Sequence, residues 1–387
     1  MGMSILKTKI EIIKYIASSN NEKLSSNDGT NYMENGNGIE IIKELLVTEI
    51  GETAHAYLHK NIDLSNNVTM LQSTSTRFNV EKINLNKFKN IVNIKRVNDI
   101  RWLNKFFEVV NSKLPIDGIF IGCVETKRER KARILRKSPS PFNWLHYSID
   151  FIHKRIAPKI WLTKRLYFSL TKGKNRVITK AETLGRLISC GFKIIDEVEI
   201  NNYTWFVVKK VSLPLYDNNP SYGPIYKMPR IGKNGKIINV YKLRTMHPFS
   251  EYLQEYMIEK YGYDNEGKGK IKNDFRATTL GSFFRRYWLD ELPQLINVFK
   301  GEMVLVGVRP LSRTRFNEFP DEMKKRRTQF KPGCFPPYVA LLMPNEEDNI
   351  KAEKIYLDQK EKHPFWTDIK FFWLSVYNIV TNKIRSA

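Results

Sequence analysis

Two stretches of the chain repeat one order of elements, a helix followed by a buried strand, and this order limits the possible folds more than any other feature. In the first stretch, Trp102, Phe106 and Val109 recur at helical spacing, and the apolar run 118–124 follows as a strand. In the second, a helix over 181–189 stops at a Cys-Gly pair and is followed by strands over 192–195 and 204–210. Such alternation predicts an α/β layer.

This part of the chain also resembles the later strands of a class I methyltransferase fold. The similar segments are Asp117-Gly118-Ile119-Phe120-Ile121-Gly122 and Ile188-Ser189-Cys190-Gly191-Phe192. The glycine-rich loop that holds the cofactor in that family has no counterpart here. The resemblance therefore implies an incomplete Rossmann-like domain that acts as a scaffold or docking module and does not transfer methyl groups.

Length and composition allow two or three domains. The chain has 387 residues, of which 42% are hydrophobic, enough for sizeable cores. In residues 1–79 we predict N-terminal helices and a flexible loop, with a short helix over 1–17, a loop rich in Ser, Asn and Gly over 18–38, and a helix over 39–49. A methyltransferase-like α/β domain over 80–212, with an insertion at 127–180, and a further domain over 213–387 are expected to follow.

The positive charge of the chain is concentrated in the insertion. Residues 127–180 hold sixteen Lys and Arg against two acidic residues, Glu129 and Asp150, which leaves +14 of the net charge of +24. Apolar residues recur at helical spacing from Leu145 to Ile156 and again over 160–170, which predicts two amphipathic helices joined at Pro158. A basic amphipathic pair of this kind is typical of contact with an anionic membrane surface.

Two other interpretations of the insertion stay open. In one, it is a helical element packed on its own domain with a solvated basic face. In the other, its interleaved aromatic and basic side chains stack on the bases of a nucleic acid. No recognised nucleic-acid motif accompanies the charge, so we expect no nucleic-acid partner.

Other features concern the cellular setting. Three cysteines, Cys123, Cys190 and Cys334, have no metal-ligand spacing and are too few for a disulfide framework, which favours a reducing cytosol. The start of the chain mixes Lys and Glu with apolar residues, so we expect no signal peptide. No apolar run reaches about 18 residues, so we expect no transmembrane span. These features still allow the protein to lie on a membrane.

Two adjacent carboxylates, Asp290 and Glu291, stand in an apolar frame within this basic chain. Arg276 and Arg285 precede them and Arg309 follows, and guanidinium groups suit bidentate phosphate contacts. A carboxylate beside a diphosphate repels it unless a divalent cation bridges the two, and Mg²⁺ prefers one or two carboxylates plus phosphate oxygens. The pair therefore predicts chemistry on a phosphorylated substrate with Mg²⁺ bound, although adjacent acids also occur on ordinary solvated helices.

A β-hairpin is predicted upstream of the carboxylates. Asn234-Gly235 lies between two apolar runs, which is the strongest short-range signal for a tight turn. On the strand that follows, period-two alternation places Lys242 and Arg244 on the same side. Such a pair would either clamp a phosphate or form an ordinary solvated face.

Six segments occur in an order that resembles the bacterial sugar transferase family, the monotopic phosphoglycosyl transferases. They are Gly223-Pro224-Ile225-Tyr226, Arg230-Ile231-Gly232-Lys233-Asn234-Gly235, Tyr241-Lys242-Leu243-Arg244-Thr245-Met246, residues 289–298, residues 301–310, and Lys331-Pro332-Gly333. Each segment alone is a weak signal. Together they cover residues 220–335, with a looser similarity that continues to 387.

The resemblance implies an α+β catalytic domain over 213–387 and an activity at the membrane surface. Members of this family move a sugar 1-phosphate from a UDP-sugar to polyprenyl (undecaprenyl) phosphate, which initiates the synthesis of a capsule, exopolysaccharide, O-antigen or glycoprotein glycan. The aspartate of the Asp-Glu pair is the family's nucleophile, so Asp290 would expel UMP and form a phosphosugar-aspartyl intermediate. Glu291 would hold Mg²⁺, and polyprenyl phosphate would then resolve the intermediate.

The same resemblance assigns roles to basic residues. Those expected to bind the phosphates of the substrate are Lys242, Arg244, Arg276, Arg285 and Arg309. Arg309 and Pro310 match the last two residues of the family's Pro-Arg-Pro segment and are expected to contact the nucleotide. The partners implied are the UDP-sugar, the polyprenyl phosphate and an anionic membrane surface, at the cytoplasmic face of the inner membrane in a peripheral or monotopic arrangement.

The chain departs from the family pattern at three places. Members usually carry a hydrophobic re-entrant helix directly before the Gly-Pro segment, whereas Val207 to Asn219 is too short and too polar for one. Val308 replaces the first proline of Pro-Arg-Pro, and Trp288 stands where a small hydroxyl residue is usual. The basic helix pair, with an aromatic cluster at 371–377, would then contribute to anchoring, although ordinary helix packing is the simpler explanation of that cluster.

A second function is kept as an alternative. A catalytically inactive family member would act as a scaffold in a glycan assembly complex, but retention of Asp290, Glu291 and their basic partners argues against it. The identity of the sugar depends on pocket contacts that no short motif fixes. A homo-oligomer is compatible with the sequence.

Overall fold

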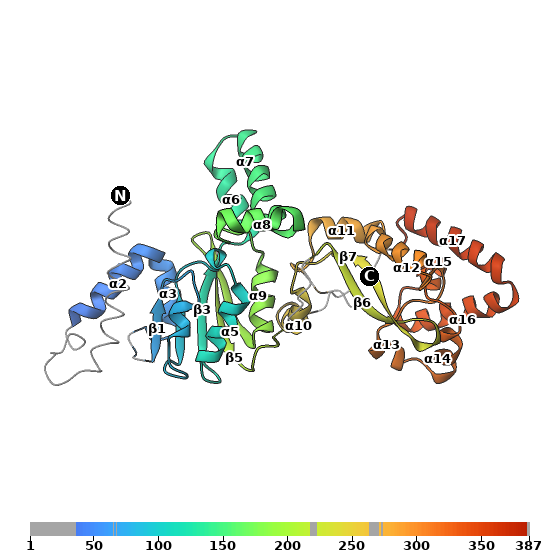
Figure 1. The fold of residues 1–387 in the computed structure, drawn as a ribbon, viewed down its shortest axis with the longest axis horizontal. Helices are drawn as coiled ribbons and strands as arrows, with labels where there is room; N and C mark the ends of the chain where they lie inside the picture. The colour runs from blue at the N-terminus through green and yellow to red at the C-terminus, as the bar shows by residue number, and fades with distance from the viewer. Residues whose placement is uncertain are drawn as a thin grey trace. The chain divides into compact units, whose positions relative to one another are not determined.

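The computed structural model describes residues 36–384 except 65, 67, 217–222, 263–270 and 272–273 (Figure 1). The helix predicted over 1–17 and most of the loop predicted over 18–38 lie outside these residues. The chain divides into two compact units, the first comprising Met1–Asn219 and Pro248–Tyr256, the second Pro220–His247 and Met257–Ala387. The predicted domain limits at 80 and 213 stay predictions.

A five-stranded mixed sheet forms the centre of the first unit, with strand order β1-β2-β3-β5-β4 (Figure 1). Strands β1 (Thr69–Gln72), β2 (Asn90–Asn93) and β3 (Ile119–Val124) are parallel. Strand β5 (Tyr203–Lys210) is antiparallel to both β3 and β4 (Phe192–Ile200). The sheet confirms the predicted α/β layer and begins at β1, before residue 80, while the resemblance to a methyltransferase stays a prediction.

Helices cover both faces of this sheet (Figure 1). On one face, Leu46 of α2 (Gly36–Ile50) and Leu58 of α3 (Glu52–Asn61) share a core with Ile121 of β3. Strand alternation turns the neighbouring Phe120 to the other face, where α5 (Leu103–Lys113) and α9 (Lys180–Ser189) pack. There five phenylalanines form the core, with ring centroids 5.7 to 6.5 Å apart: Phe106, Phe107, Phe120, Phe192 and Phe206.

Short elements complete the first unit. They are α4 (Phe78–Glu81), the 3₁₀ turns η2 (Val97–Asp99) and η6 (Ser250–Leu253), and the start of α10 (Gln254–Tyr261). The η6 segment packs on α9 at Gly185, where a Cβ would lie 2.2 Å from the carbonyl oxygen of Phe249. Only glycine allows this close approach.

The insertion between β3 and α9 is helical, as the sequence predicted. It consists of α6 (Lys127–Lys137), α7 (Phe142–Phe151), the π turn η3 (Ile152–Ile156), the 3₁₀ turn η4 (Ala157–Lys159) and α8 (Trp161–Thr171). Helix α6 begins with a capping box, in which the side chains of Thr126 and Glu129 each accept a backbone N–H. Pro158 lies in η4 and separates the two predicted amphipathic helices.

A β-hairpin and a set of short helices open the second unit. Strands β6 (Ile225–Ile231) and β7 (Ile237–Leu243) are antiparallel and are joined by η5 (Lys233–Gly235). Asn234 and Gly235 have φ values of 56° and 74°, which confirms the predicted Asn-Gly turn. After α10 come α11 (Thr279–Arg286), the 3₁₀ helix η7 (Leu289–Gln294) and α12 (Leu295–Phe299).

The rest of the second unit packs helices on a short parallel strand pair, β8 (Val304–Val306) and β9 (Gly333–Phe335). The helices are α13 (Arg313–Asn317), α14 (Asp321–Thr328), α15 (Pro337–Leu341), α16 (Glu346–Lys362) and α17 (Pro364–Val380). Val306, Phe319, Tyr356 and Phe371 belong to the same core. Within the described part of the chain, every helix is too short or too polar to cross a bilayer.

Candidate active site

The two adjacent carboxylates lie on η7, directly after a sharp change of chain direction. Trp288 adopts a left-handed backbone conformation with φ 56°, which is rare for a bulky residue. Its indole ring is buried and packs near Tyr338, with ring centroids 6.4 Å apart. The N–H of Glu291 donates to the carbonyl of Trp288 at 3.1 Å. Burial of the indole therefore fixes the start of the turn that carries Asp290 and Glu291.

One lysine serves both carboxylates. The Nζ of Lys242, on β7, lies 2.6 Å from Glu291 Oε1 and 3.9 Å from Asp290 Oδ2. The side chains of Asp290 and Glu291 are only 3% and 14% exposed. The amide of Gln294 donates to the second carboxylate oxygen of Glu291. Two carboxylates and one ammonium group therefore meet in a largely buried place.

This donor set fits a divalent cation that is also bound by substrate. In the described part of the chain, no group of three or more His, Cys, Asp or Glu side chains could hold a metal ion. Mg²⁺ does not require such a group, because it is commonly held by one or two carboxylates while phosphate oxygens and water complete its ligands. Glu291 is the residue that would supply such a carboxylate, beside Asp290.

A buried asparagine holds the strand of Lys242 against the helix that follows η7. The Nδ2 of Asn297, on α12, donates to Asn239 O at 2.7 Å and to Glu302 Oε2 at 2.6 Å. Its Oδ1 accepts the N–H of Tyr241 at 3.1 Å. These bonds fix the backbone on both sides of residue 240, so they determine where the neighbouring Lys242 is presented.

Arg309 lies over the ring of Tyr338. Its guanidinium lies 5.2 Å from the centroid of the Tyr338 ring. Burial raises the pKa of the Tyr338 hydroxyl to about 12, with a lowering contribution from Arg309 and raising contributions from Glu291 and Asp290. Tyr338 therefore lies within electrostatic range of the predicted nucleotide-binding arginine and of both carboxylates.

The backbone of Arg309 is held by a buried ion pair. Arg327 contacts Glu353 with two bonds of 3.0 and 3.1 Å, and both side chains are less than 5% exposed. Arg327 also donates to Arg309 O at 2.6 Å, and Arg309 N–H donates to Glu353 at 3.2 Å. Pro310 continues this segment in a partly buried position, whereas Val308 lies in the core.

The other predicted phosphate-binding arginines have partners in the second unit. Arg276 makes a two-point contact with Asp274, at 2.8 Å for each bond. Arg285 donates to Thr245 Oγ1 at 2.9 Å, and Arg244 donates to Gly223 O at 3.1 Å. Burial alone would raise the pKa of Asp274, but the hydrogen bonds from Arg276 hold that pKa below its ordinary value.

Several residues of this site were not identified from the sequence. Gln294 stands three residues after Glu291, a spacing that brings side chains together in a helix. This spacing could have predicted the contact between the two side chains. Asn297 and Tyr338 contribute through contacts with distant segments. No sequence pattern distinguishes Arg327 or Glu353, because each lies in a run of mixed charges that is typical of a solvated helix.

Comparisons with known proteins point to one family. Residues 205–382 match the family described as bacterial sugar transferase. A galactosyl transferase of Streptococcus agalactiae is 33% identical over 158 residues, 40% of this chain and 34% of that protein. Undecaprenyl-phosphate galactose phosphotransferase of Salmonella typhimurium is 37% identical over 126 residues, 31% of this chain and 24% of that protein.

A third relative covers more of the chain. UDP-glucose:undecaprenyl-phosphate glucose-1-phosphate transferase of Klebsiella pneumoniae is 27% identical over 212 residues, 51% of this chain and 42% of that protein. The chain thus spans less than half the length of each of these three relatives. The segment matched by the family contains every candidate site residue, whereas the insertion at 127–180 lies outside it.

Proposed function

Because residues 205–382 belong to the bacterial sugar transferase family, we propose that this chain transfers a sugar 1-phosphate from a UDP-sugar to undecaprenyl phosphate at the cytoplasmic surface of a membrane. One observation carries the proposal. The buried Asp290 stands beside a Glu291–Lys242 ion pair. This arrangement supports Asp290 as the nucleophile, Glu291 as the carboxylate for the metal and Lys242 as a cation for phosphate.

The reaction proceeds by two displacements at one phosphorus. A carboxylate oxygen of Asp290 attacks the sugar-bearing phosphorus, the bond from that phosphorus to the bridging oxygen breaks, and UMP leaves. A phosphate oxygen of undecaprenyl phosphate then attacks the same phosphorus, which releases Asp290 and forms the sugar-linked diphosphate lipid. Both steps exchange one phosphorus–oxygen bond for another and need no oxidant or reductant.

The surrounding residues prepare the site for phosphate. Glu291 would hold Mg²⁺, which neutralises diphosphate charge when bound. Lys242 pairs with Glu291 in the structure and would offer its ammonium to the phosphate when substrate binds. Arg309, held over Tyr338, contributes a guanidinium for the nucleotide diphosphate. Arg244, Arg276 and Arg285 are assigned to further phosphate contacts.

The test measures UMP release by the purified protein with Mg²⁺, a panel of UDP-sugars and undecaprenyl phosphate in nanodiscs. We expect acceptor-dependent UMP from the wild type and at least about a thousandfold less from Asp290→Asn. Asp321→Asn is the matched control, since the Asp321 side chain is 89% exposed. Without acceptor, one UMP per chain and a phosphosugar adduct on the protein would support the aspartyl intermediate.

The alternative function is an inactive scaffold. Absence of UMP across a broad donor panel, from folded and membrane-bound protein, would overturn the proposed transfer and favour the scaffold. Equal UMP release by Asp290→Asn and wild type would retain the transfer reaction but remove Asp290 as nucleophile.

A further inference from the structure

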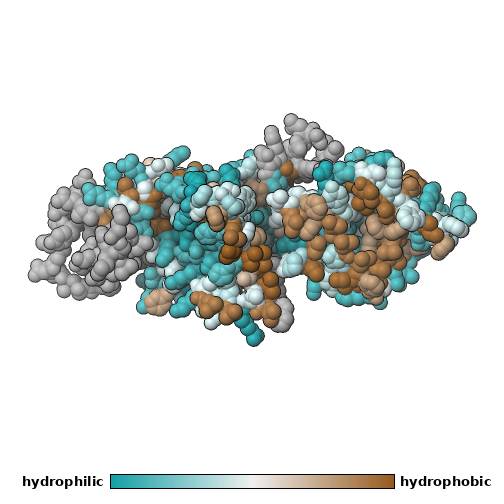
Figure 2. Space-filling view, turned by 90° about the horizontal axis from the view of Figure 1, so that it is seen from above, coloured by the Kyte–Doolittle hydropathy of each residue, from teal (hydrophilic) through white to brown (hydrophobic). Residues whose placement is uncertain are grey.

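Helix α7 exposes its apolar side. None of its described residues is buried, and the exposed fractions of Leu145 and Ile149 are 61% and 59%. Ile152, in the π turn that continues the helix, is 57% exposed. Leu162, Leu166 and Leu170 follow one another along α8 and are 62% to 72% exposed. In the view from above, hydrophobic side chains gather over this part of the first unit (Figure 2).

The opposite side of α7, which carries Asp150, faces the domain instead. Asp150 accepts two hydrogen bonds from Arg130 of α6, at 2.7 and 2.6 Å. Arg155, in the following turn, donates to Glu182 Oε2 at 2.8 Å and to Val177 O at 2.9 Å. A helix that packs on a globular core normally presents the opposite orientation, with its apolar side inward. These ion pairs therefore fix α7 with its apolar side outward.

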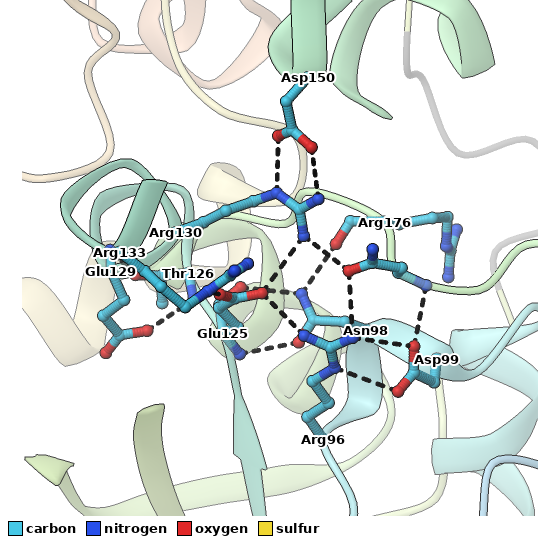
Figure 3. A network of polar contacts seen from close by, with 11 residues as sticks. Arg96, Asn98, Asp99, Glu125, Thr126, Glu129, Arg130, Arg133, Asp150 and Arg176 are labelled. Atoms are coloured by element: carbon cyan, nitrogen blue, oxygen red, sulfur yellow. Dashed lines mark hydrogen bonds and ion pairs between the residues drawn. The ribbon is translucent and has the colours of Figure 1, made fainter. Parts of the chain in front are cut away.

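The Arg130–Asp150 ion pair belongs to a network at the carboxyl ends of β2 and β3 (Figure 3). Glu125, only 2% exposed, contacts Arg96 at 2.8 Å, Arg130 at 3.2 Å and Arg133 at 2.5 Å. Open α/β sheets often bind ligands at this edge. Here the arginines pair with Glu125, Asp99 and Asp150, so the network is poorly suited to bind an anion. It holds the insertion on its domain instead.

Other cations of the insertion point outward. Six exposed residues have no ion-pair partner within the part of the chain that the structure describes: Arg136, Lys137, Lys164, Arg165, Lys172 and Lys174. The ammonium of Lys131 lies 4.6 Å from the ring of Trp144, which is 49% exposed. Exposed aliphatic and aromatic side chains thus stand among uncompensated positive charges.

We propose that residues 127–174, the basic hairpin, form a docking surface for an anionic lipid bilayer. Leucine and isoleucine side chains enter the acyl region while the surrounding lysines and arginines contact anionic headgroups. Nucleic acid is a poorer fit, because aliphatic side chains do not stack on bases. A second copy is also a poorer fit, because two surfaces of the same charge repel each other. The basic hairpin lies outside residues 205–382, and this inference does not depend on the transfer reaction.

The first test places an environment-sensitive fluorophore on the full chain at Leu166→Cys, with Leu85→Cys as control. Leu85 is 68% exposed in the first unit but lies outside the basic hairpin, and the native cysteines are buried. Vesicles are phosphatidylcholine alone or with roughly a third phosphatidylglycerol, without undecaprenyl phosphate. We expect a blue shift, and quenching by acyl-chain nitroxides, only for the label at position 166 and only with anionic vesicles.

The second test measures vesicle co-sedimentation. Lys164→Glu/Arg165→Glu is expected to lower partitioning at least about 25-fold, since each cation near the surface contributes about a factor of five. Lys87→Glu/Lys89→Glu changes the charge of the first unit by the same amount outside the basic hairpin and is expected to have a much smaller effect. Sedimentation with vesicles while the label at 166 stays in water would place the membrane contact elsewhere and overturn the proposal. Burial of the label by an oligonucleotide or by self-association without vesicles would also overturn it.

Discussion

The ammonium group of Lys242 lies near both carboxylates of the candidate active site. Gln294 also donates a hydrogen bond to Glu291 from the same turn. The positions of Asp290 and Glu291 therefore depend on residues that do not themselves react. At the scale of residues, the predictions concern such supporting contacts.

Replacing Gln294 with leucine keeps the volume of the side chain and removes the hydrogen bond to Glu291. A hydrogen bond to a charged group is worth about 1.5–3 kcal/mol, so we expect a loss of about 10- to 100-fold in kcat/KM for UMP release. Gln329→Leu, at the exposed end of α14, is the control. Unchanged kinetics in a folded Gln294→Leu protein would show that this contact does not position Glu291.

The Asp274–Arg276 pair predicts a dependence of stability on pH. The pKa of Asp274 is depressed below its ordinary 3.8, so the folded state binds this proton less tightly than the unfolded chain. Its stabilising contribution is full above the unfolded pKa and is lost as the pH falls through the lower folded pKa. We expect the destabilisation by Asp274→Asn in urea unfolding to be largest at neutral pH and to shrink below about pH 3. A difference independent of pH would contradict this prediction.

At the scale of elements, short helices depend on distant segments for their placement. The 3₁₀ helix η7 is fixed by burial of Trp288 near Tyr338 of α15, and β7 is held by Asn297 of α12. The segment of Arg309 is held in the same way by α14 and α16 through the Arg327–Glu353 pair. Rigid contacts between elements thus determine the geometry of the site.

Removing one partner of the Arg327–Glu353 pair leaves a buried charge without compensation. We expect Glu353→Ala to lower the free energy of unfolding of the second unit by about 3–5 kcal/mol. Replacing both partners with apolar residues, Arg327→Met/Glu353→Leu, is expected to cost less than the single change. Urea unfolding of the three proteins measures both effects. A single-variant cost below about 1 kcal/mol would show that the pair contributes little.

At the scale of the whole molecule, the chain is two units with separate cores. The first unit carries the basic hairpin on an α/β sheet, and the second carries the two carboxylates on the 3₁₀ helix η7. All three cysteines are buried, Cys123 and Cys190 in the first unit and Cys334 in the second. The native thiols can therefore report on each unit separately.

Burial raises the pKa of Cys190 and of Cys334 to about 12 and also raises that of Cys123, so little thiolate exists at neutral pH. We expect the native protein to resist alkylation until a unit opens. Glu353→Ala should increase the labelling of Cys334 and leave Cys123 unchanged, as measured by mass spectrometry of digested protein. Equal increases at both cysteines would show that the two units open together.

The sequence alone determined what periodicity and turn chemistry encode locally. The helix–strand order predicted the α/β layer, Asn234-Gly235 predicted the hairpin, and Pro158 predicted the break between two amphipathic helices. Strand β1 was missed because four residues, half of them polar, show no clear alternation. The order of motifs identified the family, which matches residues 205–382.

Only the tertiary structure decided which groups meet. Lys242 reaches Glu291 across 49 positions of the chain, and Arg327 reaches Glu353 across 26. No local pattern contains such pairings, because they depend on how separate elements pack. The outward orientation of the apolar side of α7 also required the structure, since amphipathic spacing defines two sides of a helix but not which side faces the core. The ion pairs of Asp150 and Arg155 with buried partners determine which side of α7 faces the core.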